Sequence, residues 1–268
     1  MTGPTTSLVL RLAGPLQSWG SRSQFNRRDT AGVPTKSGII GLLAAAAGRR
    51  RGDDLTDLLQ VSLAVRTDQA GSLLRDYHTV SDYRGGFLPN SELNRRGRQE
   101  RSKGKATAVT ERWYLQDAVF VVAIGGPAGL LSGLADALQQ PSFPLALGRR
   151  ACPPAQPLLI SPPLADADAD KRLWVGAPTD VMSRAPWQAS SRYQDRRRRS
   201  GDLPAQIELP VVADDLDGSG QLTDVPVDFA PRERGFRTRP VSHTWARIAV
   251  AQPSDGPGGH DPFALLGW

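Results

Sequence analysis

Apolar positions in the first half of the chain recur in two patterns, one typical of strands and one typical of helices. Residues 118–124 are continuously apolar, as expected of a central strand. Residues 61–67 and 73–80 alternate and could pair through a turn at 68–71. The predicted strands cover residues 7–13, 61–67, 73–80, 110–115 and 118–124, and the predicted helices cover residues 36–49 and 128–139, with a short helix compatible with 53–60. Strand, helix, two strands and helix is the order of a ferredoxin-like domain.

The second half of the chain is less regular. Five prolines between positions 153 and 163 indicate an extended connection. Residues 206–212, 224–229 and 241–251 resemble strands of a smaller β-rich part. The sequence therefore predicts an α+β fold, with a ferredoxin-like domain at residues 1–150 and an irregular β-rich region at 151–268 that packs on it.

Composition is that of an ordinary globular protein, with 39% hydrophobic and 22% charged residues. A single cysteine, Cys152, excludes an internal disulfide framework and a cysteine-based metal cluster. No apolar run approaches the roughly 20 residues of a membrane span, and the first residues do not resemble a secretion signal. We expect a cytoplasmic protein without a membrane partner, a metal or another cofactor.

The net charge of +6 favours a polyanionic partner, although an excess of arginine over lysine is also what a GC-rich genome produces. Residues 81–105 contain almost no apolar side chain and many cations. Such a segment is either a disordered loop or an arm that a polyanion or a partner protein orders. Arg196–Arg199 form a separate basic run, expected to be a mobile surface loop with weak contact to nucleic acid as the alternative.

The start of the helix at 36–49 is a candidate phosphate site. Thr35 is a suitable N-cap, and the free N–H groups of a helix start, with Lys36 beside them, favour an anion. A nucleotide-binding P-loop is excluded, because threonines stand at both glycine positions before Lys36 and Ser37. A solvated lysine at a helix start is the alternative.

Two other features extend this candidate site. Trp19, in a Gly/Pro turn, could stack on an unpaired base, but packing against the edge of the core is favoured. Gly148 precedes Arg149 and Arg150, so the backbone can approach closely while two guanidiniums bind phosphates. Solvated arginines are the alternative there.

Catalytic groups are scarce. His78, His243 and His260 are far apart in sequence and accompany no hydrolase or metal-binding motif. The enzymatic alternative to a binding protein is a metal-independent endoribonuclease that uses His78 or His243 as a general acid or base.

Several blocks in order along the chain carry a family resemblance. They are residues 13–20 (AGPLQSWG), 28–30 (RDT), 34–43 (PTKSGIIGLL), 147–155 (LGRRACPPA) and 239–243 (RPVSH). Together they resemble the CRISPR-associated CasD family, the handle-binding subunits of type I-E Cascade. The match spans nearly the whole chain.

The resemblance implies a modified RNA-recognition fold with a protruding β-rich thumb, inserted at about residues 78–112. It implies a non-catalytic subunit that binds the 5′ handle of CRISPR RNA (crRNA) and caps a filament of backbone subunits. It also implies contact with the large subunit that recognises the protospacer-adjacent motif (PAM), and indirect contact with target DNA near the seed.

The site residues expected on these grounds form two groups. The expected RNA-binding residues are Gln17, Ser18, Trp19, Arg27, Arg28, Lys36, Ser37, Gly148, Arg149 and Arg150. The residues expected to contact RNA or a neighbouring subunit from the thumb are Arg84, Arg95, Arg96, Arg98, Arg101, Lys103 and Lys105.

Overall fold

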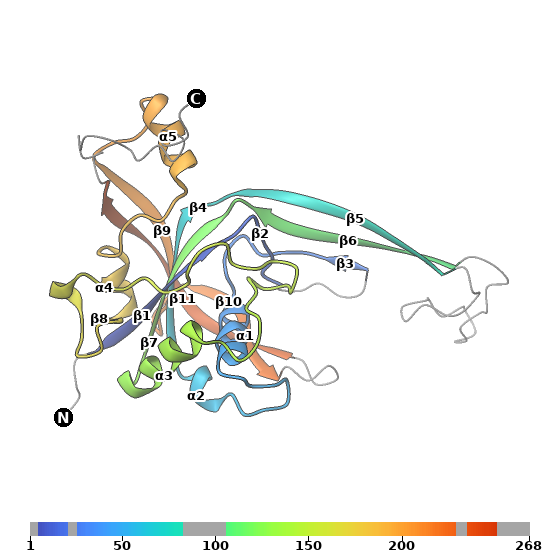
Figure 1. Cartoon of the computed structure of the whole chain (residues 1–268), viewed down its shortest axis with the longest axis horizontal. Coiled ribbons are helices and arrows are strands. Elements are labelled where there is room, and N and C mark those ends of the chain that lie inside the picture. Colours follow the sequence, from blue (N-terminus) through green and yellow to red (C-terminus); the bar gives the residue numbers. More distant parts are fainter. Residues whose placement is uncertain (1–4, 21–25, 83–105, 229–234, 251–268) are drawn as a thin grey trace, which may run out of the picture.

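The computed structural model describes residues 5–20, 26–82, 106–228 and 235–250, which form two sheets with helices around the larger one (Figure 1). Neighbouring strands of the larger sheet are antiparallel, in the order β10-β11-β9-β4-β7-β1-β8. Its strands are β1 (Thr6–Ala13), β4 (Ser62–Gln69), β7 (Val119–Gly126), β8 (Leu173–Val175), β9 (Gln206–Asp214), β10 (Gly220–Asp228) and β11 (Gly235–Ala249). The mixed α+β class predicted from the sequence is confirmed.

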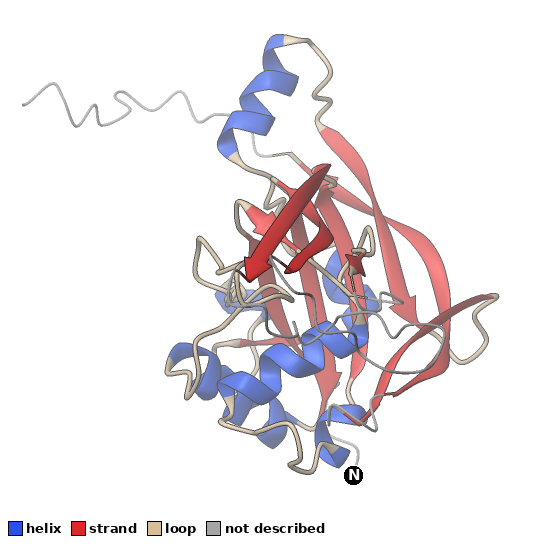
Figure 2. Cartoon of the chain, turned by 90° about the vertical axis from the view of Figure 1, so that its right-hand side faces the viewer, coloured by secondary structure: helices blue, strands red, loops and turns tan. Residues whose placement is uncertain are grey.

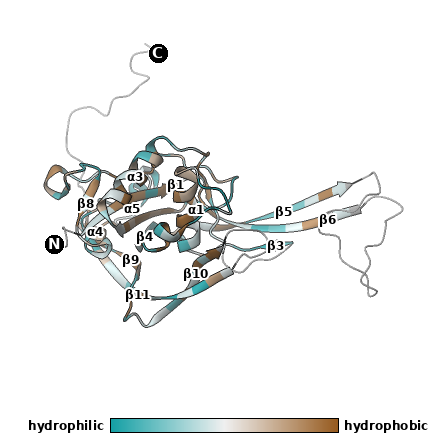
Figure 3. Cartoon of the chain, turned by 90° about the horizontal axis from the view of Figure 1, so that it is seen from below, coloured by the Kyte–Doolittle hydropathy of each residue, from teal (hydrophilic) through white to brown (hydrophobic). Residues whose placement is uncertain are grey.

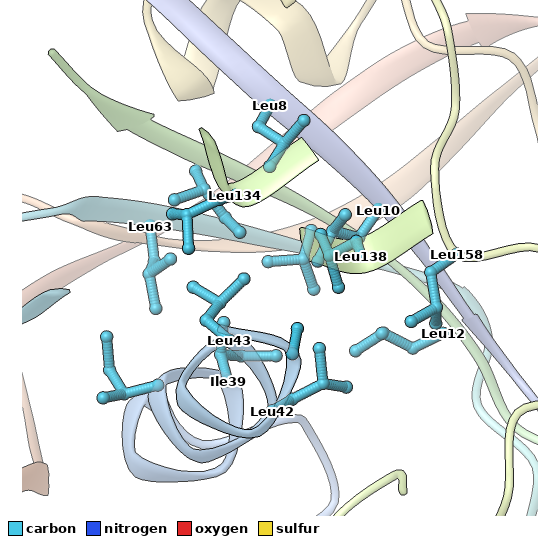
Figure 4. Packing of buried hydrophobic residues seen from close by; sticks show 14 of the residues in the cluster. Leu8, Leu10, Leu12, Ile39, Leu42, Leu43, Leu63, Leu134, Leu138 and Leu158 are labelled. Atoms are coloured by element: carbon cyan, nitrogen blue, oxygen red, sulfur yellow. The ribbon is translucent and has the colours of Figure 1, made fainter. Parts of the chain in front are cut away.

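The main core lies between this sheet and the helices α1 (Lys36–Ala46) and α3 (Ala128–Gln139), with the short α2 (Thr56–Leu59) beside them. Alternation along β1 directs Leu8, Leu10 and Leu12 toward this core, where they meet Ile39 and Leu43 of α1 (Figure 4). The predicted helix at 36–49 is confirmed over its first eleven residues and ends at Ala46.

The opposite face of the sheet is covered by α4 (Pro178–Met182) and the segment that follows it, after a 3-10 turn at Leu164–Asp166. Arg66 of β4, fully buried, donates to the carbonyl oxygens of Ala185 at 2.7 Å and Pro186 at 2.9 Å. Its other donors bind the carboxylate of Asp68, at 2.6 and 2.9 Å. The segment is therefore attached to the centre of the sheet by hydrogen bonds as well as by apolar packing.

The second sheet has four strands, and two of them project from the body as a ribbon (Figures 1 and 3). The ribbon consists of β5 (Ser72–Asp82) and β6 (Ala106–Gln116), and β2 (Leu16–Gln17) and β3 (Arg27–Arg28) pair with β6 at its root. The expected pairing of residues 61–67 with 73–80 is wrong, because β5 pairs with β6 along its whole length and β4 pairs with β7 and β9.

The chain after residue 150 returns to the main sheet. β9 pairs with β4, so β9, β10 and β11 continue the same sheet edge to edge. The division at residue 150 stays a prediction. The expectation of a loop at Arg196–Arg199 is wrong, since these residues end the helix α5 (Ser191–Arg199), which stands at one end of the molecule (Figure 2). In the described part of the chain, every helix is too short or too polar to cross a bilayer.

Candidate nucleic-acid interface

The root of the ribbon gathers arginines from three segments that are distant in sequence. β3 lies parallel to β6, which places Arg28 opposite Arg112, and the loop after Leu147 brings Arg149 against Arg28, with Arg150 next to it in the chain. We call Arg28, Arg112, Arg149 and Arg150 the ribbon-root arginines.

Arg149 is the fixed member of this group. Its guanidinium donates to the carbonyl oxygen of Trp113 in β6 at 3.1 Å and to that of Arg28 in β3 at 2.7 Å. Its Cζ lies 4.9 Å from the ring centroid of Tyr114, within the range of a cation–π contact. Arg149 therefore joins β3 to β6 and positions the surface around it.

Gly148 makes the close approach of this loop to the chain possible. Its φ is +89°, and a Cβ atom there would lie 1.8 Å from the carbonyl oxygen of Ser18. The amide of Ser18 donates to the carbonyl oxygen of Leu147 at 3.0 Å, so the two segments pack backbone to backbone. Only glycine fits this position without displacing the loop.

The remaining cations of the group are less constrained. Arg28 and Arg150 are exposed, and Arg27, also exposed, makes a 3.2 Å ion pair with Asp29. The buried Nε of Arg112 has no hydrogen-bond partner among the described residues, although Asp76 lies opposite it on β5. Arg28 and Arg112 are like charges on paired strands, which is unfavourable, and an anion bound between them removes that cost.

The sequence predicts that Gln17, Ser18 and Trp19 contact RNA, but all three are buried. The amide of Gln17 donates to the carbonyl oxygens of Leu12 at 2.9 Å and Ala118 at 2.7 Å, and the Trp19 indole donates to Gln17 Oε1 at 3.1 Å. The Trp19 ring lies against Gly38 of α1 and is fully buried. This is the core-packing alternative, so base stacking by Trp19 is corrected to a structural role.

The start of α1 also differs from the expected phosphate site. Thr35 caps the helix as predicted, accepting from the Gly38 amide at 3.2 Å. The Lys36 amide, however, donates to the carboxylate of Asp224 at 2.7 Å, and the Lys36 ammonium lies 2.8 Å from Asp214 Oδ2. Carboxylates of the same chain occupy the place assigned to a phosphate, and both Lys36 and Ser37 are buried.

Arg239 of β11 completes this buried charge network. It binds both carboxylate oxygens of Asp224, at 2.7 and 2.9 Å, and contacts Asp214 as well. Burial acts to lower the pKa of Arg239, but the hydrogen bonds of Asp224 and the charge of Asp214 outweigh it and raise the pKa. Lys36, Asp214, Asp224 and Arg239 form the α1 charge network, whose two acids the sequence alone did not single out.

The other candidates show no catalytic constellation. His78 is exposed on β5 and His243 is exposed on β11, in different sheets, whereas His260 lies outside the described residues. Burial raises the pKa of the Cys152 thiol, although Arg149 opposes the shift, so the thiol is protonated at neutral pH. Within the described ranges, histidine, cysteine and acidic residues form no group able to hold a metal ion.

The thumb residues expected from the sequence lie outside the described residues. They are Arg84, Arg95, Arg96, Arg98, Arg101, Lys103 and Lys105. The strands on either side of them form the ribbon, which projects from the body. The thumb insertion at about residues 78–112 stays a prediction.

Comparisons with known proteins agree on one family. Residues 7–242 match the family described as CRISPR-associated protein (Cas_Cas5). The chain is 38% identical over 172 residues to the CRISPR system Cascade subunit CasD of Escherichia coli (strain K12), covering 57% of this chain and 69% of that protein. Two solved structures are similar over most of their length.

The first, described as a CRISPR RNA-guided surveillance complex, has a TM-score of 0.67 and 33% identity, over 93% of this chain and 95% of the other. The second, described as a Cas protein, has a TM-score of 0.58 and 30% identity, over 89% and 94% of the two chains. The expected resemblance is confirmed, and the chain belongs to the Cas5 family of CRISPR-associated proteins, as a relative of the Cascade subunit CasD.

Proposed function

We propose that this chain is a non-catalytic RNA-binding subunit of a type I-E Cascade complex, which binds the 5′ handle of crRNA and caps the backbone filament. The observation that carries the proposal is the gathering of the ribbon-root arginines from β3, β6 and the Gly148 loop. Its relatives, a Cascade subunit and a chain of an RNA-guided surveillance complex, support this assignment.

We assign different roles to the arginines at this surface. The guanidinium of Arg149 donates to the carbonyl oxygens of Trp113 and Arg28, so we assign it a structural role. Arg28 and Arg150, exposed and without a side-chain partner among the described residues, are the groups we assign to phosphate oxygens, with Arg27 at the margin. Guanidiniums bind phosphate through two parallel hydrogen bonds, which fixes orientation as well as affinity.

The ribbon is the part of the molecule that we assign to the neighbouring backbone subunit. Leu73 is 62% exposed and Tyr77 is 58% exposed, on a two-stranded ribbon whose faces are covered by none of the helices that the structure describes (Figure 3). An isolated ribbon of this length is marginal in water, and a partner that covers its apolar side chains stabilises it. We assign the remaining contacts to the large PAM-recognising subunit and, indirectly, to target DNA near the seed.

Replacing the two exposed arginines should weaken handle binding. For R28Q/R150Q we expect at least a tenfold loss of affinity for a handle RNA, because two charge-assisted phosphate contacts are removed. The salt slope should fall by roughly 1.4, at 0.7 for each single-strand phosphate contact. Fluorescence anisotropy against salt concentration measures both.

R50Q/R51Q is the matched control, since it removes two adjacent exposed arginines after α1. Equal losses for the two double variants would refute the assignment of the ribbon root.

The non-catalytic part of the proposal has its own test. Purified protein incubated with repeat RNA in EDTA should leave the RNA intact, because the exposed His78 and His243 lie in different sheets. Site-specific cleavage that disappears in H78A or H243A would establish the endoribonuclease alternative.

A further inference from the structure

The helix α5 carries a row of arginines that the proposed function does not use. Among its five arginines, Arg197 donates to the Asp202 carbonyl oxygen at 2.6 Å and Arg198 pairs with Asp195 at 2.9 Å. The other three are exposed, and their side chains have no hydrogen bond or ion pair to the residues that the structure describes. These three, Arg192, Arg196 and Arg199, are called the α5 arginine row.

The spacing of the row places its side chains together. Positions i, i+4 and i+7 share one face of a helix, and the row spans about 10 Å at 1.5 Å per residue. Arg192, Arg196 and Arg199 alone line an open hollow of about 200 Å³. An adjoining hollow reaches Ser72 and Gln116 at the ribbon root, where Asp117 adds one carboxylate.

The helix dipole does not account for this arrangement. Arginines near a helix C-terminus are favourable, which explains Arg196 and Arg199 by itself. Arg192, however, is the second residue of α5, where a cation is unfavourable, and it adds repulsion to Arg196 one turn later. Three cations around one hollow, with no counter-charge from the described residues, are stabilised when a polyanion neutralises them.

We propose that the α5 arginine row binds the phosphate backbone of a nucleic-acid duplex, at a site separate from the ribbon-root arginines. The interval of about 6 Å between Arg192 and Arg196 along the helix is close to two phosphate intervals of one strand, roughly 3.4 Å each along the duplex axis. Such contacts fix position without reading sequence.

The charge of the row favours a phosphate backbone over a protein partner. Among the described residues, the hollow is lined by three arginines and no acid, so a protein would have to present an acidic patch at the same spacing, whereas a phosphate backbone carries evenly spaced negative charges. Single-strand sites use exposed aromatic rings. Tyr193, which follows Arg192 in α5, is half-buried and packs edge-on against Trp187, with ring centroids 6.2 Å apart. The row is therefore a surface for the outside of a duplex.

The triple variant R192Q/R196Q/R199Q tests this proposal on the full chain. We measure binding of a random-sequence 20-base-pair DNA, an RNA duplex of equal length and the single-stranded handle RNA by fluorescence anisotropy. For DNA, the salt slope should fall by roughly 2.7, so raising salt from 50 to 200 mM costs the unchanged protein about fortyfold more affinity than the variant. Affinity for the handle RNA should not change, which separates this result from the proposed function. A loss of affinity for only one of the two duplexes identifies which duplex the row prefers.

R50Q/R51Q/K171Q is the control, since it removes three exposed cations that have no side-chain bond to the described residues. Arg50 and Arg51 lie between α1 and α2, and α2 and α5 stand at opposite ends of the molecule (Figure 1). An equal fall in salt slope for the control would overturn the proposal. Unchanged duplex binding by the α5 variant would also overturn it, and if assembly with partner subunits were then lost, the row would be a protein contact.

Discussion

Asp224→Ala should lower the free energy of unfolding by about 3 to 5 kcal/mol, because it leaves the buried Arg239 with the carboxylate of Asp214 alone in place of two carboxylates. The side chains of Asp224 and Arg239 are 6% and 9% exposed, and Asp224 also accepts from the first amide of α1. Removing the carboxylate leaves two donors of Arg239 and one backbone N–H without partners. Urea denaturation followed by circular dichroism measures the change.

Asp217→Asn is the control for this experiment, since Asp217 is an exposed acid in the turn between β9 and β10. We expect a change of less than about 0.5 kcal/mol, as for most surface substitutions. A small effect of Asp224→Ala, similar to that of the control, would show that the α1 charge network does not stabilise the fold.

Gly148→Ala should destabilise the protein by about 2 to 4 kcal/mol and weaken binding of handle RNA together with stability. Two costs add at this position: a positive φ that alanine rarely adopts, and a Cβ atom placed 1.8 Å from the Ser18 carbonyl oxygen. The loop must move, and Arg149, which follows directly, then loses its hold on β3 and β6. Thermal unfolding and anisotropy measure the two effects.

Gly201→Ala separates the two costs. Gly201 also has a positive φ, +74°, but a Cβ atom there would meet nothing within 4 Å. We expect only the backbone cost, about 1 kcal/mol, and unchanged RNA binding. If both variants lost the same stability and affinity, the contact with Ser18 would not be what requires glycine at position 148.

Local rules predicted the parts of the fold that depend on neighbours in sequence. Thr35 begins α1 because its hydroxyl caps the helix, and the alternation of β1 places Leu8 and Leu10 in the core. The pairing of β5 was predicted wrongly, because a short turn after β4 appeared sufficient. The strand instead pairs across the long polar insertion with β6.

The candidate site was harder to predict, since its electrostatics depend on distant residues. The start of α1 attracts an anion, as the sequence indicated, but Asp224 supplies that anion from another strand. No local signal marks Asp214 or Asp224, whereas Arg239 stood in a block that carried the family resemblance. The Gly148 loop was identified because glycine followed by two arginines is informative without knowledge of its neighbours.

The members of the α1 charge network are made at widely different times during synthesis of the chain. The Lys36 amide binds Asp224, which is 188 positions later in the chain, and the Lys36 ammonium binds Asp214, which is 178 positions later. At roughly 5 to 20 residues per second, α1 is synthesised about 10 to 40 seconds before either acid. Until both acids have been made, the Lys36 amide and ammonium lack these two carboxylate partners, so the α1 charge network can form only late in synthesis.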